Sequence, residues 1–116
     1  MMMVADAGSV IAELRRRTGA LAAALVSRDG TLLSADLPEE VHGETFAVLS
    51  ATILGAATAI NAGLRGSPPD EIVFDGGNMR TVITSYGPAS LLVLVIGAAS
   101  DPNLTLAEMH RCASPG

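Results

Sequence analysis

The longest uncharged stretch of the chain runs from Thr45 to Leu64 and combines large and small apolar residues. The large residues recur at steps of three and four, the spacing of one helical face, and are Phe46, Leu49, Ile53, Ile60 and Leu64. A second row is small at every fourth position and contains Ala47, Ala51, Gly55, Ala59 and Gly63. A narrow polar edge holds Ser50, Thr58 and Asn61. The pattern predicts a helix that packs on a sheet through its large row and against another helix through its small row.

The same stretch is as long as a membrane-spanning helix, so a membrane protein is the first alternative. Its large residues favour insertion, but its hydroxyl, amide, glycine and alanine residues contribute little or oppose it. Rows of small residues also join membrane helices, so this feature does not separate the two cases. We expect a soluble helix and no transmembrane span, with a lipid-anchoring helix as the alternative.

The N-terminal third of the chain predicts a helix followed by a hairpin. Ser9 is the expected helix cap, and the helix ends with Arg15, Arg16 and Arg17 before Gly19, because cations favour the last turn and glycine the position after it. The segments 20–28 and 31–36 are strand-like and flank Asp29-Gly30, a strong two-residue turn signal. The long helix should then begin at Pro38, with acids in its first turn at Glu39, Glu40 and Glu44.

The C-terminal half predicts a three-strand meander and a last helix. Residues 71–75, 79–86 and 91–97 are rich in β-branched and apolar residues and are separated by glycine-containing turns. Asp101 then caps a helix that has Pro102 at its first position and runs to about Arg111. The order helix, two strands, helix, three strands, helix implies an α+β fold with a five-strand antiparallel sheet between helices. We expect one domain over residues 1–116, with its core at about 9–111.

Composition narrows the function. The formal net charge is −5 and the pI about 4.7, which argues against binding to nucleic acid. Hydrophobic residues make up 49% of the chain while charged residues make up only 16%, which suggests that a partner covers part of the surface. The N-terminal residues contain no positive segment before an apolar run, so we expect no secretory signal and a cytoplasmic location.

No residue pattern predicts catalysis. His42 and His110 lack the spacing of a zinc pair, and Cys112 follows His110 by two positions, which point apart on a helix. The acids near Glu44 are explained by a helix start, and no glycine loop is followed by the lysine of a phosphate-binding loop. We expect no enzyme, no cofactor and no metal. Arg15, Arg16 and Arg17 form a local basic cluster that is either a solvated helix end or, with Arg80, a partner contact.

The order of elements and several segments resemble the roadblock/dynein light-chain family over residues 11–109. The segments are LAAALVSRDGTLLS around Asp29-Gly30, the long small-residue helix, and GGNMRTVITSYGPASLLVLVIG followed by DPNLTLAEM. Relatives commonly start the last helix with an Asn-Leu-Gly sequence, whereas this chain has threonine at Thr105 after Asn103-Leu104.

The resemblance implies a homodimer or heterodimer whose sheets join edge to edge and whose long helices lie side by side. On that basis the dimer interface would contain Ala47, Ala51, Gly55, Ala59, Ile72, Val73 and Phe74. Members of the family act as regulators or scaffolds of small Ras-like GTPases, and those that stimulate hydrolysis are thought to reposition the GTPase's own catalytic groups. Two alternatives stay open: a small-ligand sensor with a pocket between sheet and helix, and a generic adaptor subunit.

Overall fold

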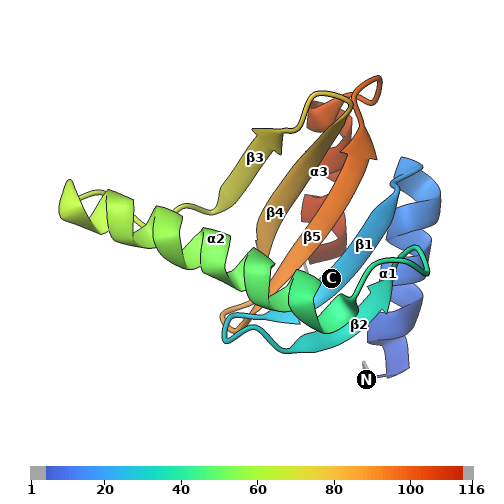
Figure 1. The fold of residues 1–116 in the computed structure, drawn as a ribbon, viewed down its shortest axis with the longest axis horizontal. Helices are drawn as coiled ribbons and strands as arrows, with labels where there is room; N and C mark the ends of the chain where they lie inside the picture. Colours follow the sequence, from blue (N-terminus) through green and yellow to red (C-terminus); the bar gives the residue numbers. More distant parts are fainter. Residues whose placement is uncertain (1–4, 114–116) are drawn as a thin grey trace.

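The computed structural model describes residues 5–113, and within them it leaves out the side chains of residues 5–7, 102, 112 and 113. The expected order of elements is confirmed (Figure 1). The helices and strands are α1 (Ala5–Thr18), β1 (Ala22–Ser27), β2 (Leu32–Asp36), α2 (Gly43–Gly63), β3 (Glu71–Asp75), β4 (Met79–Tyr86), β5 (Ser90–Gly97) and α3 (Pro102–Ala113).

The five strands form one antiparallel sheet in the order β2-β1-β5-β4-β3. The apolar strand β5 lies at its centre, where Val93 is opposite Ala24 of β1 and Ile83 of β4. A strand flanked on both sides and covered on both faces needs a nearly continuous apolar sequence, as β5 has. The edge strands are β2 and β3.

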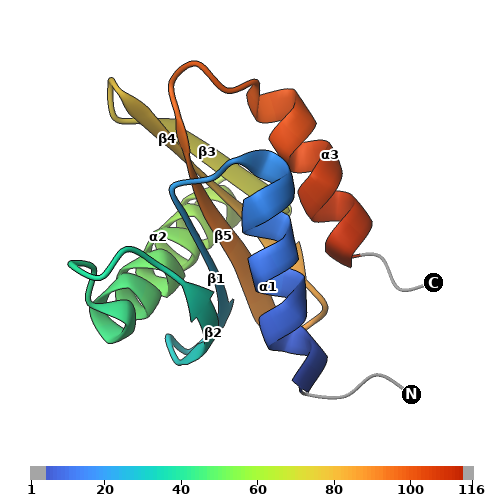
Figure 2. The ribbon, with the colours of Figure 1, turned by 90° about the vertical axis from the view of Figure 1, so that its right-hand side faces the viewer.

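Helices cover both faces of the sheet, with α1 and α3 on one face and α2 on the other (Figure 2). Alternate residues of β5 divide between the two layers: Leu92, Leu94 and Ile96 face α1 and α3, while Leu91 and Val93 face α2. Ile11, Leu14 and Met109 from the two helices complete the first layer and are almost fully buried. The prediction of an α+β sheet between helices is therefore confirmed.

The first helix begins earlier than predicted. It starts at Ala5, so Ser9 lies inside the helix and does not cap it. Alanines precede Ser9, and their high helix propensity lets the helix extend toward the N-terminus. The predicted end is correct, because Gly19 follows Thr18 with a positive φ of 67°.

The long helix begins later than predicted. Its N-cap is His42, and Glu39 and Glu40 lie in a turn before it, where the Val41 amide donates to the Pro38 carbonyl at 3.0 Å. Only Glu44 of the predicted acids lies in the first turn. A Cβ on Gly43 would lie 2.6 Å from Leu32 Cδ2, so the missing side chain lets the helix start close against β2.

The predicted cap of the last helix is confirmed. The Asp101 carboxylate accepts a hydrogen bond from the Asn103 amide at 2.9 Å, and α3 continues to Ala113. The side chain of Cys112 lies outside the described residues.

Candidate interaction surface

The face of α2 that packs on the sheet differs from the predicted one. The residues turned toward β1 and β2 are Phe46, Ala47, Ser50, Ile53 and Leu54. Ser50 was expected on a polar edge but is 5% exposed, and its hydroxyl donates to the Phe46 carbonyl at 2.8 Å. Because this bond satisfies the hydroxyl within the helix, serine can occupy a buried position.

The opposite side of α2 is apolar and uncovered, and we call it the open face. It consists of Val48, Leu49, Thr52, Gly55, Ala56, Ala59, Ile60, Gly63 and Leu64. Leu49 and Ile60, expected against the sheet, are 56% and 65% exposed, and Leu64 is 81% exposed. Exposed apolar residues arranged in one continuous stripe mark an interaction surface.

The predicted small row of α2 does not stay on one face. Residues four apart differ by about 40° around a helix, so a row from Ala47 to Ala59 turns through about 120°. Ala47 is fully buried against the sheet, Ala51 is partly buried near Gly30, and Gly55 and Ala59 are exposed. Ala47 is thus covered by the sheet in a single copy, and the interface role of Ala47, Ala51, Gly55 and Ala59 stays a prediction.

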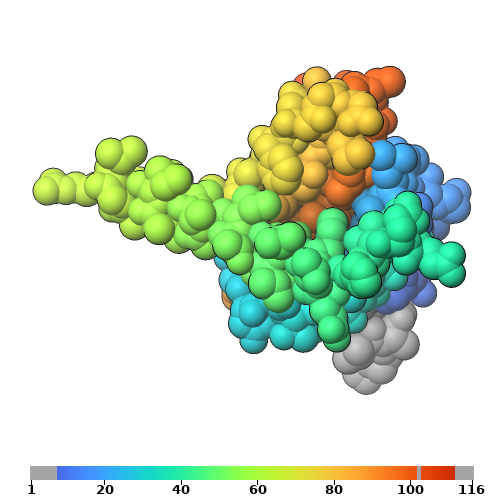
Figure 3. All heavy atoms as spheres, viewed as in Figure 1, coloured from blue at the N-terminus to red at the C-terminus, as the bar shows by residue number. Residues whose placement is uncertain are grey.

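The C-terminal half of α2 extends beyond the sheet. Figures 1 and 3 show it projecting past β3 as a rod with no other element beside its tip. Only 17% of its most apolar 18-residue stretch is buried, and the helix is long and apolar enough by length and composition to cross a membrane. Such a helix is weak evidence for a span, because core helices of soluble proteins meet the same criteria. The absence of a transmembrane span stays a prediction.

Strand β3 presents a second uncovered region. It pairs with β4 and has no partner strand on its other side within the described residues. Val73 and Phe74 are 45% and 41% exposed, whereas Ile72 packs against the core under α2. The free edge of a strand is a template for pairing with another chain. The interface role of Ile72, Val73 and Phe74 stays a prediction.

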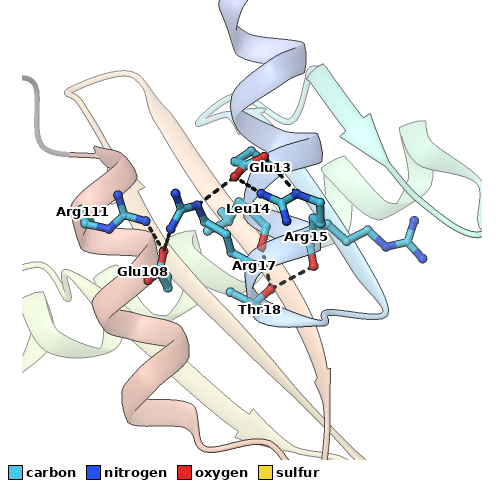
Figure 4. Close-up of polar contacts among 8 residues, drawn as sticks. Glu13, Leu14, Arg15, Arg17, Thr18, Glu108 and Arg111 are labelled. Carbon is cyan, nitrogen blue, oxygen red and sulfur yellow. Dashed lines mark hydrogen bonds and ion pairs between the residues drawn. The ribbon is translucent and has the colours of Figure 1, made fainter.

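The basic cluster at the end of α1 is occupied by contacts within the chain (Figure 4). Arg15 donates to the Asp36 carboxylate at 2.7 Å and to the carbonyls of Leu21 at 2.9 Å and Ala20 at 3.1 Å. These hydrogen bonds hold the end of α1 against the residues that lead into β1 and against the end of β2. Arg15 therefore stabilises the packing of α1 on the sheet.

Arg16 and Arg17 share the Glu13 carboxylate, and Arg17 also links α1 to α3. Both arginines pair with the Glu13 carboxylate, and the Nε of Arg17 lies 2.9 Å from it (Figure 4). A terminal guanidinium nitrogen of Arg17 also lies 3.9 Å from the Glu108 carboxylate of α3. Hydrogen bonds from Arg16 and, to a smaller extent, from Arg17 lower the pKa of the Glu13 carboxyl. The hydrogen bond with Glu13 in turn raises the pKa of Arg16. A partner that contacts either arginine must compete with these carboxylates.

Arg80 is also paired. Its Nε lies 2.5 Å from the Asp75 carboxylate, and these two residues are opposite each other on β4 and β3. The pair therefore helps to hold the edge strand in place. Partner contacts stay predictions for Arg15, Arg16, Arg17 and Arg80.

A hollow of about 490 Å³ lies beside the start of α2, between the helix and the sheet. It is lined by Arg15, Leu21, Ala22, Pro38, Glu40, Val41, Phe46, Met79 and Val95. Its lining is mostly apolar and includes one arginine and one glutamate. Within the part of the chain that the structure describes, no three histidine, cysteine or acidic residues are grouped as metal ligands.

The structure is an α+β domain with an uncovered apolar helix face on α2 and a free strand edge at β3. The chain belongs to the roadblock/LC7 family, whose model matches residues 6–96, so the predicted family is confirmed. This is a family of regulatory and adaptor domains.

Similar proteins cover nearly the whole chain. An uncharacterized protein of Methanocaldococcus jannaschii is 26% identical over 104 residues, covering 90% of this chain and 87% of that protein. A structure described as MglB with tetrameric arrangement is 28% identical, with a TM-score of 0.87 over 96% of this chain and 85% of that one. The gliding protein MglB of Thermus thermophilus is 26% identical, with a TM-score of 0.83 and the same coverage.

A more distant likeness concerns the fold alone. Profilin II of Acanthamoeba castellanii is 15% identical and has a TM-score of 0.68, covering 92% of this chain and 93% of that one. The sheet between helices is thus shared with profilin.

Proposed function

We propose that the protein is a cytoplasmic, homodimeric interaction module that binds and regulates a small Ras-like GTPase. Membership of the roadblock/LC7 family supports this function. The observation that carries it is the open face of α2, where Leu49, Ile60 and Leu64 are each more than half exposed in a single copy. Apolar residues at this density on one face favour burial by a protein partner.

Two features support a homodimer. The free edge of β3 can extend the sheet through the β3 of a second copy, and α2 projects past that same edge (Figure 1). Two such sheets joined by a two-fold axis place the two α2 helices beside each other on the same face of the joined sheet. The small residues Gly55 and Ala59 then permit close approach of the helix backbones, because a Cβ on Gly55 meets nothing within 4 Å in one copy.

The arginine contacts favour regulation by surface complementarity. Arg15, Arg16, Arg17 and Arg80 each have a carboxylate partner within the chain. Inserting one of them into the catalytic site of a GTPase requires breaking that pair. For these four arginines, the pairing favours a dimer that acts on hydrolysis by positioning the GTPase's own groups.

The test has two stages. A pull-down from the native cell identifies the GTPase, and a phosphate-release assay then measures its GTP hydrolysis with and without this protein. We expect binding and faster phosphate release. Binding without acceleration reduces the function to that of a scaffold, and purified protein that binds no small GTPase overturns the proposal. A variant with the open face disrupted, Leu49→Asp, is the control, because Leu49 is exposed and its change leaves the core intact.

The hollow beside α2 favours a second candidate, a small-ligand sensor. Its volume of about 490 Å³ lies in the range of small-molecule sites, and its lining is largely apolar. Thermal unfolding in the presence of a set of small apolar carboxylic acids and amines tests it. A rise in unfolding temperature that Met79→Trp abolishes supports a ligand site, and no rise with any compound removes this candidate for those classes.

A further inference from the structure

The hollow beside α2 lies where the helix stops covering the sheet. The residues of α2 that are buried against the sheet are Ala47, Ser50 and Leu54, and they pack over the end where β1 ends and β5 begins. The other end, where β1 begins and β5 ends, is open on this face (Figure 1). Ala22 and Val95 are opposite each other on β1 and β5 at that end, and both line the hollow.

The apolar lining of the hollow is exposed where the neighbouring part of the same sheet face is covered. Leu21 and Met79 are 44% and 39% exposed, whereas Ile83, four positions further along β4 on the same face, is buried under α2. A Cβ on Gly97, which is opposite Met79 on β5, would meet nothing within 4 Å. A ligand with an apolar body would remove this surface from water, which is favourable.

The hollow carries one charge that nothing in the described chain balances. Its charged lining residues are Arg15 and Glu40. The guanidinium of Arg15 donates to the Asp36 carboxylate at 2.7 Å and to the Leu21 carbonyl at 2.9 Å, so its charge is compensated. Glu40 is exposed and has no cationic partner among the described residues. The uncompensated charge at the hollow is therefore negative.

Neighbouring acids add to this negative charge. Within the described residues, the acidic side chains without a hydrogen-bond or ion-pair partner are Glu39, Glu40, Glu44 and Asp70. All of them except Asp70 fall within positions 39–44, in the loop before α2 and its first turn. This segment attracts a cation and repels an anion.

The position of the hollow favours a small molecule over a protein segment. Strands β1, β5 and β4 each pair with a neighbouring strand on both sides, so they offer no free edge to an extended peptide. No lining residue belongs to β3 or to the open face of α2, so the proposed dimer contacts do not use the hollow. Its volume of about 490 Å³ lies in the range of small-molecule sites.

We propose that the hollow binds a small amphipathic cation, an organic ammonium whose apolar body covers Met79 and Val95 and whose charge lies against Glu40. This inference rests on the small-ligand candidate of the proposed function and names its chemical class. Both parts of the ligand are required, because the sheet supplies only apolar contact and Glu40 supplies the charge. An anion with the same body is repelled, and a cation without the body gains little.

The experiment is an NMR titration of the full chain at pH 7 with four probes. They are 2-phenylethylamine, which is protonated at this pH, its neutral analogue 2-phenylethanol, its anionic analogue 3-phenylpropionate, and ethylamine, which lacks the ring. 2-Phenylethylamine should give saturable shifts at Leu21, Met79 and Val95. The alcohol should bind about three- to fivefold more weakly, because it lacks the ion pair with an exposed carboxylate. The other two probes should give no saturable shift over the same concentrations.

Variants assign the two parts of the site. Glu40→Gln should weaken binding of 2-phenylethylamine about three- to fivefold and leave the affinity for 2-phenylethanol unchanged. Glu40→Arg should bind 3-phenylpropionate in preference to the amine. Glu39→Gln is the matched control, because it removes a neighbouring charge that does not line the hollow, and it should change the affinity less than about twofold. Met79→Trp should fill the hollow and abolish binding of both the amine and the alcohol.

The outcomes separate this inference from the candidate on which it rests. Equal affinity for the amine and the alcohol, or a Glu40→Gln protein that binds the amine like the wild type, overturns the cationic class and leaves a ligand site. No saturable shift at the hollow with any of the three phenyl compounds overturns both. Shifts at the same residues that grow with protein concentration, without any probe, show that a second copy fills the hollow and also overturn the inference.

Discussion

The two faces of the central sheet differ in how far a single chain completes them. On one face, α1 and α3 bury Ile11, Leu14 and Met109 and are joined by the ion pair between Arg17 and Glu108. On the other face, α2 buries Ala47, Ser50 and Leu54 and leaves Leu49, Ile60 and Leu64 exposed. The first layer is complete within the chain and stabilises the fold, whereas the second layer is complete only when something covers it.

This difference means that different residues of the chain should determine the folding stability and the association with a partner. Substitutions under α1 should change the free energy of unfolding, and substitutions on the open face of α2 should change binding. A matched pair of substitutions, one on each side, tests this separation directly.

The largest expected effect comes from removing a buried leucine. Leu14 is fully buried, so Leu14→Ala should lower the free energy of unfolding by about 2–5 kcal/mol through lost apolar contact and a residual cavity. Leu64 is 81% exposed, so Leu64→Ala should change the stability of the monomer by less than about 0.5 kcal/mol. Urea denaturation under dilute conditions measures both. Equal losses for the two variants would remove the distinction between the faces.

A smaller effect should separate the two sides of α2 itself. Ala47 is fully buried, so Ala47→Leu should cost about 1–3 kcal/mol of folding stability by overpacking the layer against the sheet. Gly55 has open space around it, so Gly55→Leu should fold normally, and its weaker dimer should show at least about a tenfold higher dissociation constant, or about 1.4 kcal/mol. Unfolding curves measure the loss of stability in Ala47→Leu, and light scattering at micromolar concentration measures the weaker dimer of Gly55→Leu. A Gly55→Leu protein with unchanged molar mass would exclude close approach at that position.

The smallest effect concerns the ion pairs that Glu13 makes with Arg16 and Arg17 within α1. The arginines lower the pKa of Glu13 in the folded chain, so its contribution is present above the ordinary pKa of glutamate and is lost as pH falls through the lowered pKa. The group is exposed and screened, so the loss should be small. Thermal unfolding of the wild type and Glu13→Gln between pH 7 and pH 3 measures it. The two proteins should differ at pH 7 and converge at acid pH, and a constant difference across that range would contradict the assignment to Glu13.

Much of the fold was accessible from local signals. The strands at residues 71–75 and 79–86 were predicted with their observed bounds, because glycine turns and β-branched runs mark them. The cap at Asp101 was predicted from the side-chain chemistry of the first turn. Helix starts were less accessible: α2 begins at Gly43, which lies against Leu32 of another element, and α1 begins at Ala5, before the predicted cap.

The candidate surface was predicted only in part. The sequence indicated that α2 has a side for a second chain, but it assigned Leu49 and Ile60 to the sheet and Ser50 to solvent. The apolar pattern of α2 extends around most of the helix, so it does not identify the buried side. Ser50 satisfies its own hydroxyl within the helix, which removes the polar signal that would have marked its face.

The sequence by itself determined the kinds of element, their order, the α+β fold and the family, because these depend on local propensity and on the period of apolar residues. Only the tertiary structure decided which side of α2 is buried, which arginines are already paired, and that α2 projects past the β3 edge. These properties depend on where distant segments meet, and a helix that is apolar on nearly all sides can pack in more than one orientation until its neighbours select one.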